Sequence, residues 1–513
     1  MPILRNRPTP LYPRPPDERR LARRPPADTL HDLNLDQVFA SISAGADEYQ
    51  FAEIFECPAD DLEVVEHRHE VFRDLENDET LHVLRDFVVD AAAVRTRLAQ
   101  KLYDDLQAHR WFLGTVLAHC RAVAAAGDGL AGAPVSSAGL CALRGRLAAY
   151  RQSTEFTELF DQATRLDKAF EELRFVVFTH AGKITVAAPG DEPDFAGSVL
   201  ATFERFASVG SGERREEHRG THQLDRVESA VLHLLSQLYP KLFTDAAEFH
   251  RNNAGFVPQW LQDDEREAAF FLQYVDFMQS LDAAGTHWVL PTLSRTDRTE
   301  RVVAGCDVAL ARQLAKDHRR CVANDWQLTP PEQILAVSGP NQGGKTTTAR
   351  MFGQLHYLAS LGLPVPAVEA RLFLPDAVYT HFERAESIET LAGKLEDELR
   401  RARSLLERAT KDSVVIFNET FGSTSLADAY ALGASVLRRV IDVGAIGVYV
   451  TFVDELTRLD EHVVSMMSTT DTSDDSVRTF KVVRKRADGK VHAAAIARRY
   501  HLTYQDIRQQ VAS

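Results

Sequence analysis

Residues 334–352 read ILAVSGPNQGGKTTTARMF, and this stretch decides the fold of the C-terminal part of the chain. It begins with an apolar, strand-like run from Ile334 to Val337. The next residues, Gly339 to Thr346, fit the spacing G-x-x-x-x-G-K-[ST] of a phosphate-binding loop, or P-loop. A strand before this loop and a helix after it are required, because the helix N-terminus directs its amides at the phosphate. The stretch therefore predicts an α/β nucleotide-binding domain.

Each part of this loop has a predicted role. Gly343 and Gly344 allow backbone amides to converge on phosphate oxygens. Lys345 reaches the β- and γ-phosphates, and the hydroxyl of Thr346 faces Mg²⁺, so the expected ligands are ATP and Mg²⁺. The residues expected to hold the nucleotide are Gly339, Pro340, Asn341, Gln342, Gly343, Gly344, Lys345, Thr346 and Thr347.

A second apolar run, VVIFNETFGSTS at 414–425, ends in a polar pair, as the metal-binding strand of a P-loop protein does. Glu419 is expected to orient or deprotonate the attacking water, so Glu419 and Lys345 are the predicted catalytic residues. Asn418 stands where many ATPases have an aspartate. An amide brings no negative charge to a hard dication, so a magnesium site built from Thr346 and Asn418 is expected to be weak.

The chain around these motifs divides by pattern into three segments. Residues 1–30 are rich in proline and arginine and predict a disordered basic tail. Residues 31–290 predict a mainly helical domain with a β-hairpin near 174–188, and its stretch 81–127 predicts either two abutting helices or one long rod. In 291–513, short apolar runs alternate with helices, which predicts a largely parallel, doubly wound sheet.

Composition indicates the cellular location of the protein more clearly than its function. No window approaches the roughly 18 uninterrupted apolar residues of a membrane helix, and no signal peptide is visible, so we expect a cytoplasmic protein without a membrane partner. The five cysteines are widely spaced, as in a reduced protein. The net charge of −15 does not indicate a nucleic-acid binder, but a local basic face is compatible with it.

The motifs resemble the MutS family of DNA mismatch-repair proteins. GPNQGGKTTTAR resembles the family loop GPNxGGKST, whose Pro-Asn is more particular than a generic P-loop. NETFGSTSLADA resembles the family segment DExGxGTSxxDG. Weaker similarities are VANDWQL, LASLGLPVPA and the C-terminal VHAAAIARRYHLTYQDIRQQV. The resemblance covers roughly residues 295–513, and more weakly the helical region before them.

The resemblance implies an ABC-type, MutS-like ATPase domain preceded by a helical core and lever domain. It also implies a homodimer with composite ATP sites, and DNA as a partner. Phe51-Ala52-Glu53 fits the family's mismatch wedge, but an ordinary helix is expected there. We therefore expect a shortened homologue without the mismatch-recognition domain, and no nuclease domain after the ATPase domain.

Three departures from the family pattern fall on the hydrolytic machinery. Asn418 replaces an aspartate, and Phe452 aligns with a γ-phosphate-sensing histidine. The family's trans-acting Ser-Thr-Phe loop falls near 387–391 without a fixed register. The leading hypothesis is an ATP-dependent DNA-binding protein with slow hydrolysis, coupled to dimer arm movement and lacking mismatch specificity. The alternative is a dimeric scaffold that binds ATP, hydrolyses little and engages a protein.

Overall fold

The structure is a computed structural model that describes residues 8–14, 25–180, 183–189, 226–384, 393–471 and 478–487. Two compact units divide the chain. The P-loop unit comprises the described residues of 1–76, 136–142 and 267–513, and the helical unit those of 77–135 and 143–266. None of the described helices combines the length and the apolar character that crossing a membrane requires.

The P-loop unit is built on a six-stranded sheet with the order β10-β11-β12-β7-β13-β14. The first five strands run parallel, and β14 pairs antiparallel with β13. This confirms the predicted α/β fold with a largely parallel sheet. The strands are β7 (Ile334–Ser338), β10 (Val378–Phe382), β11 (Val414–Asn418), β12 (Ile446–Val450), β13 (Val463–Thr470) and β14 (Arg478–Arg484).

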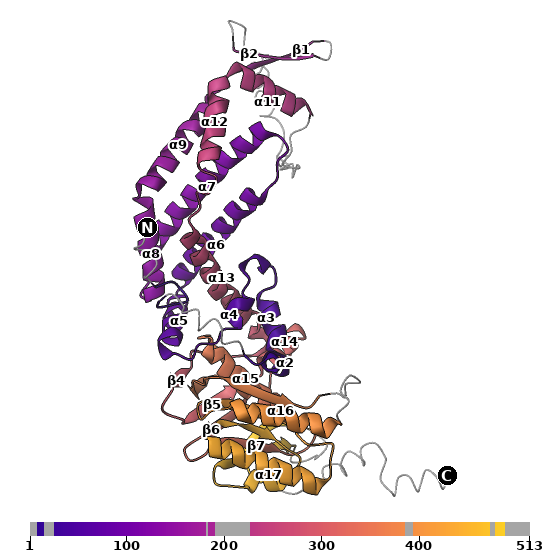
Figure 1. Ribbon diagram of the computed structural model, residues 1–513. Helices are drawn as coiled ribbons and strands as arrows, with labels where there is room; N and C mark the ends of the chain where they lie inside the picture. The colour runs from indigo at the N-terminus through magenta and orange to yellow at the C-terminus, as the bar shows by residue number, and fades with distance from the viewer. Residues whose placement is uncertain are drawn as a thin grey trace, which may run out of the picture. The chain divides into compact units, whose positions relative to one another are not determined.

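Helices cover both faces of this sheet, because successive side chains of a strand point to opposite sides. On one face, Gly353 of α15 (Lys345–Ser360) lies against the side chain of Ile416. On the other, Val415 and Phe417 belong to a buried apolar cluster with residues of α16 and α17. Those two helices span Lys394–Arg408 and Leu426–Val443 (Figure 1). The strand β11 is therefore buried on both faces, as its uninterrupted apolar run predicts.

Smaller elements complete the P-loop unit. A four-stranded sheet has the order β4-β9-β5-β6, and β3 pairs with β8. These strands are β3 (Trp288–Val289), β4 (Thr292–Ser294), β5 (Glu300–Gly305), β6 (Asn324–Leu328), β8 (Val365–Pro366) and β9 (Glu369–Phe373). The helices are α2 (Ala27–Asp32), α3 (Leu35–Ile42), η2 (Asp47–Tyr49), α4 (Ala52–Phe55), α5 (Leu62–Asp74), η3 (Asp282–Ala284), α14 (Val308–Lys316) and η4 (Asp454–Arg458).

The division into units differs from the predicted boundary near residue 290. Residues 31–76 pack with the P-loop unit instead of the helical unit. The hydroxyl of Tyr357 on α15 donates to the carbonyl of Phe55 at 2.8 Å, and Gln354 donates to the carbonyl of Leu33 at 2.9 Å. The cause is that both polar side chains of α15 are buried and find their acceptors in the N-terminal helices.

The predicted disordered tail is wrong for the described residues before 31. Leu11 is only 1% exposed, and its amide donates to Glu267 at 2.8 Å. The guanidinium of Arg68, on α5, donates to the carbonyl of Leu11 at 3.2 Å and to that of Leu361, the C-cap of α15, at 2.7 Å. Proline forbids a regular helix at 8–14, but side chains of α5 and α13 (Gln259–Ser280) hydrogen-bond to the bent backbone there.

The helical unit is a bundle of helices with a β-hairpin at one end (Figure 1). The stretch 81–127 forms two abutting helices, α6 (Asp78–Ala99) and α7 (Asp105–Gly132), rather than one rod. The hairpin is confirmed: β1 (Val176–His180) pairs antiparallel with β2 (Lys183–Ala187). The other helices are α9 (Thr154–Glu171), α11 (Arg226–Leu238), α12 (Pro240–Asn252) and parts of α8 (Ala138–Arg151) and α13 (Gln259–Ser280).

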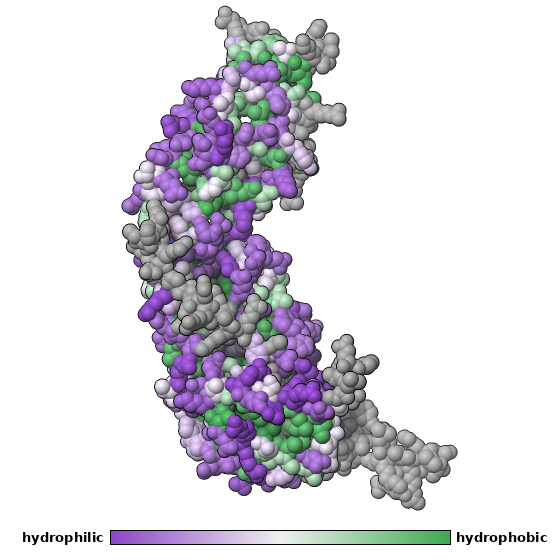
Figure 2. Space-filling model, in the orientation of Figure 1, coloured by the Kyte–Doolittle hydropathy of each residue, from purple (hydrophilic) through white to green (hydrophobic). Residues whose placement is uncertain are grey.

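A buried ion pair joins α8 to α13 inside the helical unit. Arg146 donates to both oxygens of Asp264, at 2.8 and 2.7 Å. On the face of this unit that Figure 2 shows, hydrophilic residues predominate, and hydrophobic residues gather near the end that carries the hairpin. There Phe175, Val177 and Phe178 are each about two-fifths exposed.

Candidate nucleotide site

The P-loop follows β7 and lies tightly against β13. Gly339 and Gly344 have φ values of 113° and 94°, a left-handed conformation that favours glycine. A Cβ on Gly343 would lie 2.5 Å from the Ser468 hydroxyl and 2.9 Å from the carbonyl of Pro340. The glycines therefore allow the loop to close over β13 and to form a backbone cradle ahead of α15. A cradle of this kind fits phosphate.

Lys345 begins α15 and is buried inside the loop. Its side chain is 4% exposed, and its ammonium donates to the carbonyl of Gly339 at 2.9 Å and to the side-chain oxygen of Asn341 at 3.1 Å. Burial lowers the pKa of Lys345, and the nearby carboxylate of Glu419 opposes that shift. These two oxygen atoms of the P-loop thus hold the Lys345 ammonium beside the backbone cradle.

Glu419 lies directly beyond the carboxyl end of β11. One of its oxygens, Oε1, lies 3.6 Å from the Lys345 ammonium, and its side chain is 36% exposed. The amide of Glu419 donates to the carbonyl of Val450, the last residue of β12, at 3.1 Å. The fold therefore brings together the two residues predicted to be catalytic, because the carboxyl ends of parallel strands meet at one edge of the sheet.

Asn418 ends β11 and is 7% exposed. Its Oδ1 atom is buried, and within the described part of the chain nothing donates to it. The hydroxyls of Ser338, the last residue of β7, and of Ser468, in the neighbouring strand β13, are likewise buried without a described partner. Unpartnered oxygens at this edge fit a hydrated divalent cation, since Mg²⁺ keeps several water ligands that must donate to protein oxygens.

Comparison with known proteins matches residues 335–507 to the model of MutS domain V. The DNA mismatch repair proteins MutS and HexA of Streptococcus pneumoniae are each 28% identical to this chain over 314 residues. That alignment covers 59% of this chain and 35% of theirs. Residues 335–507 of the chain are therefore a MutS domain V. Endonuclease MutS2 of Thermus thermophilus is 29% identical to this chain over 192 residues, and that alignment covers 37% of this chain and 26% of the relative.

The MutS-family match confirms the resemblance read from the motifs. It identifies the P-loop unit as containing the ATPase domain of a family related to mismatch repair. The chain spans about a third of the length of the mismatch repair relatives it matches.

The other predicted MutS-type loop residues lie around the same cradle. Thr346 and Thr347 are half-buried in the first turn of α15, Pro340 is buried, and Asn341 and Gln342 are exposed. The trans-acting loop predicted near 387–391 and the closing helices of the C-terminus lie outside the described residues.

Phe452, which we expect to align with a MutS-family histidine, follows β12 at the same edge. Its side chain is 45% exposed, and its ring lies 3.8 Å from the Cβ position of Gly422. An exposed phenyl ring here offers a flat apolar surface, but it has no nitrogen that can hydrogen-bond to a phosphate oxygen.

Arg478 is a cation near the P-loop that no sequence motif indicates. Arg478, the first residue of β14, donates to the carbonyl of Asn341 at 3.2 Å. It lies far from the P-loop in sequence and belongs to no motif, so only the pairing of β14 with β13 brings it there. An arginine at this place adds positive charge beside the cradle.

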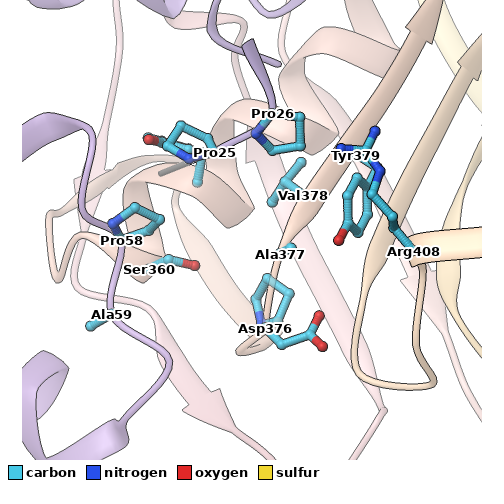
Figure 3. A pocket seen from close by; sticks show the side chains of 12 residues that line it. Pro25, Pro26, Pro58, Ala59, Ser360, Asp376, Ala377, Val378, Tyr379 and Arg408 are labelled. Atoms are coloured by element: carbon cyan, nitrogen blue, oxygen red, sulfur yellow. The ribbon is translucent and has the colours of Figure 1, made fainter. Parts of the chain in front are cut away.

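A well-defined pocket in the P-loop unit is not this site. Its walls include Pro25, Pro26, Pro58 and Tyr379, with the Arg408 guanidinium over the Tyr379 ring (Figure 3). Tyr379 lies at the amino end of β10, whereas the P-loop lies beyond the carboxyl end of the parallel strand β7. The pocket therefore opens at the opposite edge of the sheet from Lys345 and Glu419.

Proposed function

We propose that this chain is a MutS-like ATPase that binds ATP with Mg²⁺, hydrolyses it slowly, and uses the cycle to control binding to DNA. The observation that carries the proposal is the 3.6 Å approach of Lys345 to Glu419 at the edge where the P-loop opens. In the proposed form, the protein is a cytoplasmic homodimer with composite ATP sites in an ABC-type arrangement. Its helical core and lever segments move on DNA without mismatch specificity.

The chain's own residues divide the work. The amides of the P-loop, with Lys345, bind and orient the phosphates. Glu419 accepts a proton from the attacking water, or orders it, in line with the γ-phosphate. Thr346 would bind the metal directly and Asn418 through a water, and Mg²⁺ supplies charge neutralisation of the phosphates when bound. Slow hydrolysis follows because Asn418 adds no charge to the metal and Phe452 no hydrogen bond to the phosphate.

Asn418→Asp tests the metal argument. We expect the variant to reach half-maximal turnover at a several-fold lower magnesium concentration, because a carboxylate attracts the dication. The measurement is phosphate release across a magnesium titration. Asn252→Asp, an exposed position on α12, is the matched control and should leave the requirement unchanged. An equal or higher magnesium requirement in Asn418→Asp would show that the amide does not limit metal binding.

DNA binding is tested by gel-shift titration at low salt with homoduplex, mismatched and branched DNA. We expect binding to at least one of them to change between ATP, ADP and no nucleotide, with no preference for the mismatch. Low salt matters because phosphate contacts weaken steeply as salt rises. Lys345→Ala should remove the dependence on nucleotide. The absence of binding to every DNA in every nucleotide state would contradict the proposal.

The exposed ring of Phe452 favours a second candidate, a nucleotide-gated scaffold that dimerises on ATP and engages a protein. In this candidate the Phe452 ring, which is 45% exposed beside the site, would form part of the contact with the protein partner. The two candidates differ in observable behaviour. The scaffold would assemble on ATP, release little phosphate and ignore DNA, whereas the DNA-binding ATPase would respond to DNA.

A further inference from the structure

The turn that carries Glu419 has an uncommon backbone. Glu419 and Phe421 have φ values of 52° and 61°, so two of three successive residues are left-handed without being glycine. Residues other than glycine, asparagine and aspartate seldom adopt this conformation, and it persists only where the surroundings determine it. The turn must therefore be held from outside.

Three buried contacts hold it. The amide of Glu419 donates to Val450 at 3.1 Å, and the hydroxyls of Thr420 and Tyr449 lie 2.9 Å apart. Both of these come from β12. The third contact comes from helix α16, where the carboxylate of Glu398 accepts the amide of Phe421 at 3.0 Å. Of these three contacts, the one between Phe421 and Glu398 connects the turn to a helix.

Glu398 is an unusual residue to find in this place. It is 2% exposed, and its second oxygen, Oε1, accepts from no described residue. Burial raises its pKa, while Lys394 and Arg401 nearby pull in the other direction. A buried carboxyl group is costly unless it is hydrogen-bonded, and a backbone amide that it binds is held firmly. The helix is itself fixed at this point, since His381 of β10 binds the backbone carbonyl of Glu398 at 3.0 Å.

We propose that Glu398 is a positioning residue for hydrolysis. By binding the Phe421 amide, it holds the left-handed turn in which the Glu419 carboxylate faces Lys345 and the phosphate cradle. Glu398 does not touch the nucleotide; it acts through the backbone of Glu419. This inference rests on the proposed ATPase function, with Glu419 acting on water.

The test compares Glu398→Ala and Glu398→Gln in the full chain by steady-state phosphate release. Alanine should lower kcat by about 10- to 100-fold with KM for ATP within twofold, because a misplaced carboxylate slows the chemistry without changing nucleotide binding. Glutamine should restore most of kcat, since its side-chain oxygen can accept the same amide. The matched control is Glu396→Ala, an exposed residue on the same helix that pairs with Arg400.

Each outcome decides something. A kcat unchanged in Glu398→Ala would overturn the proposal, and so would a Glu398→Gln variant that folds and binds ATP normally but hydrolyses as slowly as the alanine variant. If Glu398→Ala does not fold, Glu398→Gln still decides: a near-normal kcat supports the amide contact, and a large loss at normal KM overturns it. Hydrolysis that is unchanged in Glu419→Gln would instead remove the role assigned to Glu419, on which this inference rests. A lack of phosphate release by the unaltered protein would remove the proposed ATPase function, whatever Glu398 does.

Discussion

Lys345→Ala should abolish useful ATP binding, weakening it by at least about 100-fold. The ammonium is buried, with two acceptors of the loop and one carboxylate around it. Without it, the Glu419 carboxylate would face the nucleotide's phosphates with no cation of the loop between them, so the loss combines a missing attraction with an added repulsion. Isothermal titration with ATP and Mg²⁺ measures the change directly.

The control for this variant is Lys316→Ala, an exposed lysine at the end of α14. It removes the same charge from the same unit and should bind ATP as the unaltered protein does. Circular dichroism should show both variants folded. If Lys345→Ala retained normal affinity for ATP, the nucleotide would have to bind elsewhere. The assignment of the P-loop as the nucleotide site would then be wrong.

Glu419→Gln should bind ATP normally but lower phosphate release by about 10²- to 10⁴-fold, the usual worth of a general base. The amide keeps the size of the carboxylate, so the turn after β11 should persist while the proton acceptor is lost. Single-turnover phosphate release separates this effect from nucleotide binding.

Glu407→Gln is the matched control for the base, because Glu407 is exposed on α16 and pairs with Arg403. It should hydrolyse at the unaltered rate. Two results would count against the assigned role: unchanged release in Glu419→Gln, or a loss that comes entirely from weaker ATP binding.

The P-loop and its surroundings could be predicted from local sequence. The spacing of Gly339, Lys345 and Thr346 specifies a loop between strand and helix, and both elements form where expected. The run 414–418 ends as a strand at Asn418, as its uninterrupted apolar character indicates. These features depend on a few consecutive residues, so a short window contains nearly all the information that determines them.

Features set by distant pairings could not be predicted. Ser468 closes the P-loop only because Met467 pairs with Ser338 across the sheet. The segment 136–142 joins the P-loop unit through the Asp74 carboxylate, which accepts the amides of Ser136 and Ser137. Neither Ser468 nor the segment 136–142 belongs to a motif, and the sequence around each does not indicate which distant residues it will contact.

The burial of residues 8–14 changes how the chain should be handled at the bench. Arg68 binds the carbonyls of both Leu11 and Leu361, so one guanidinium joins this segment to the end of the helix that starts at Lys345. Trimming the first fourteen residues as a dispensable leader would remove one acceptor of that guanidinium, the Leu11 carbonyl, and the Tyr12 ring over which the guanidinium lies. Removing these residues would therefore alter the packing of the P-loop unit itself.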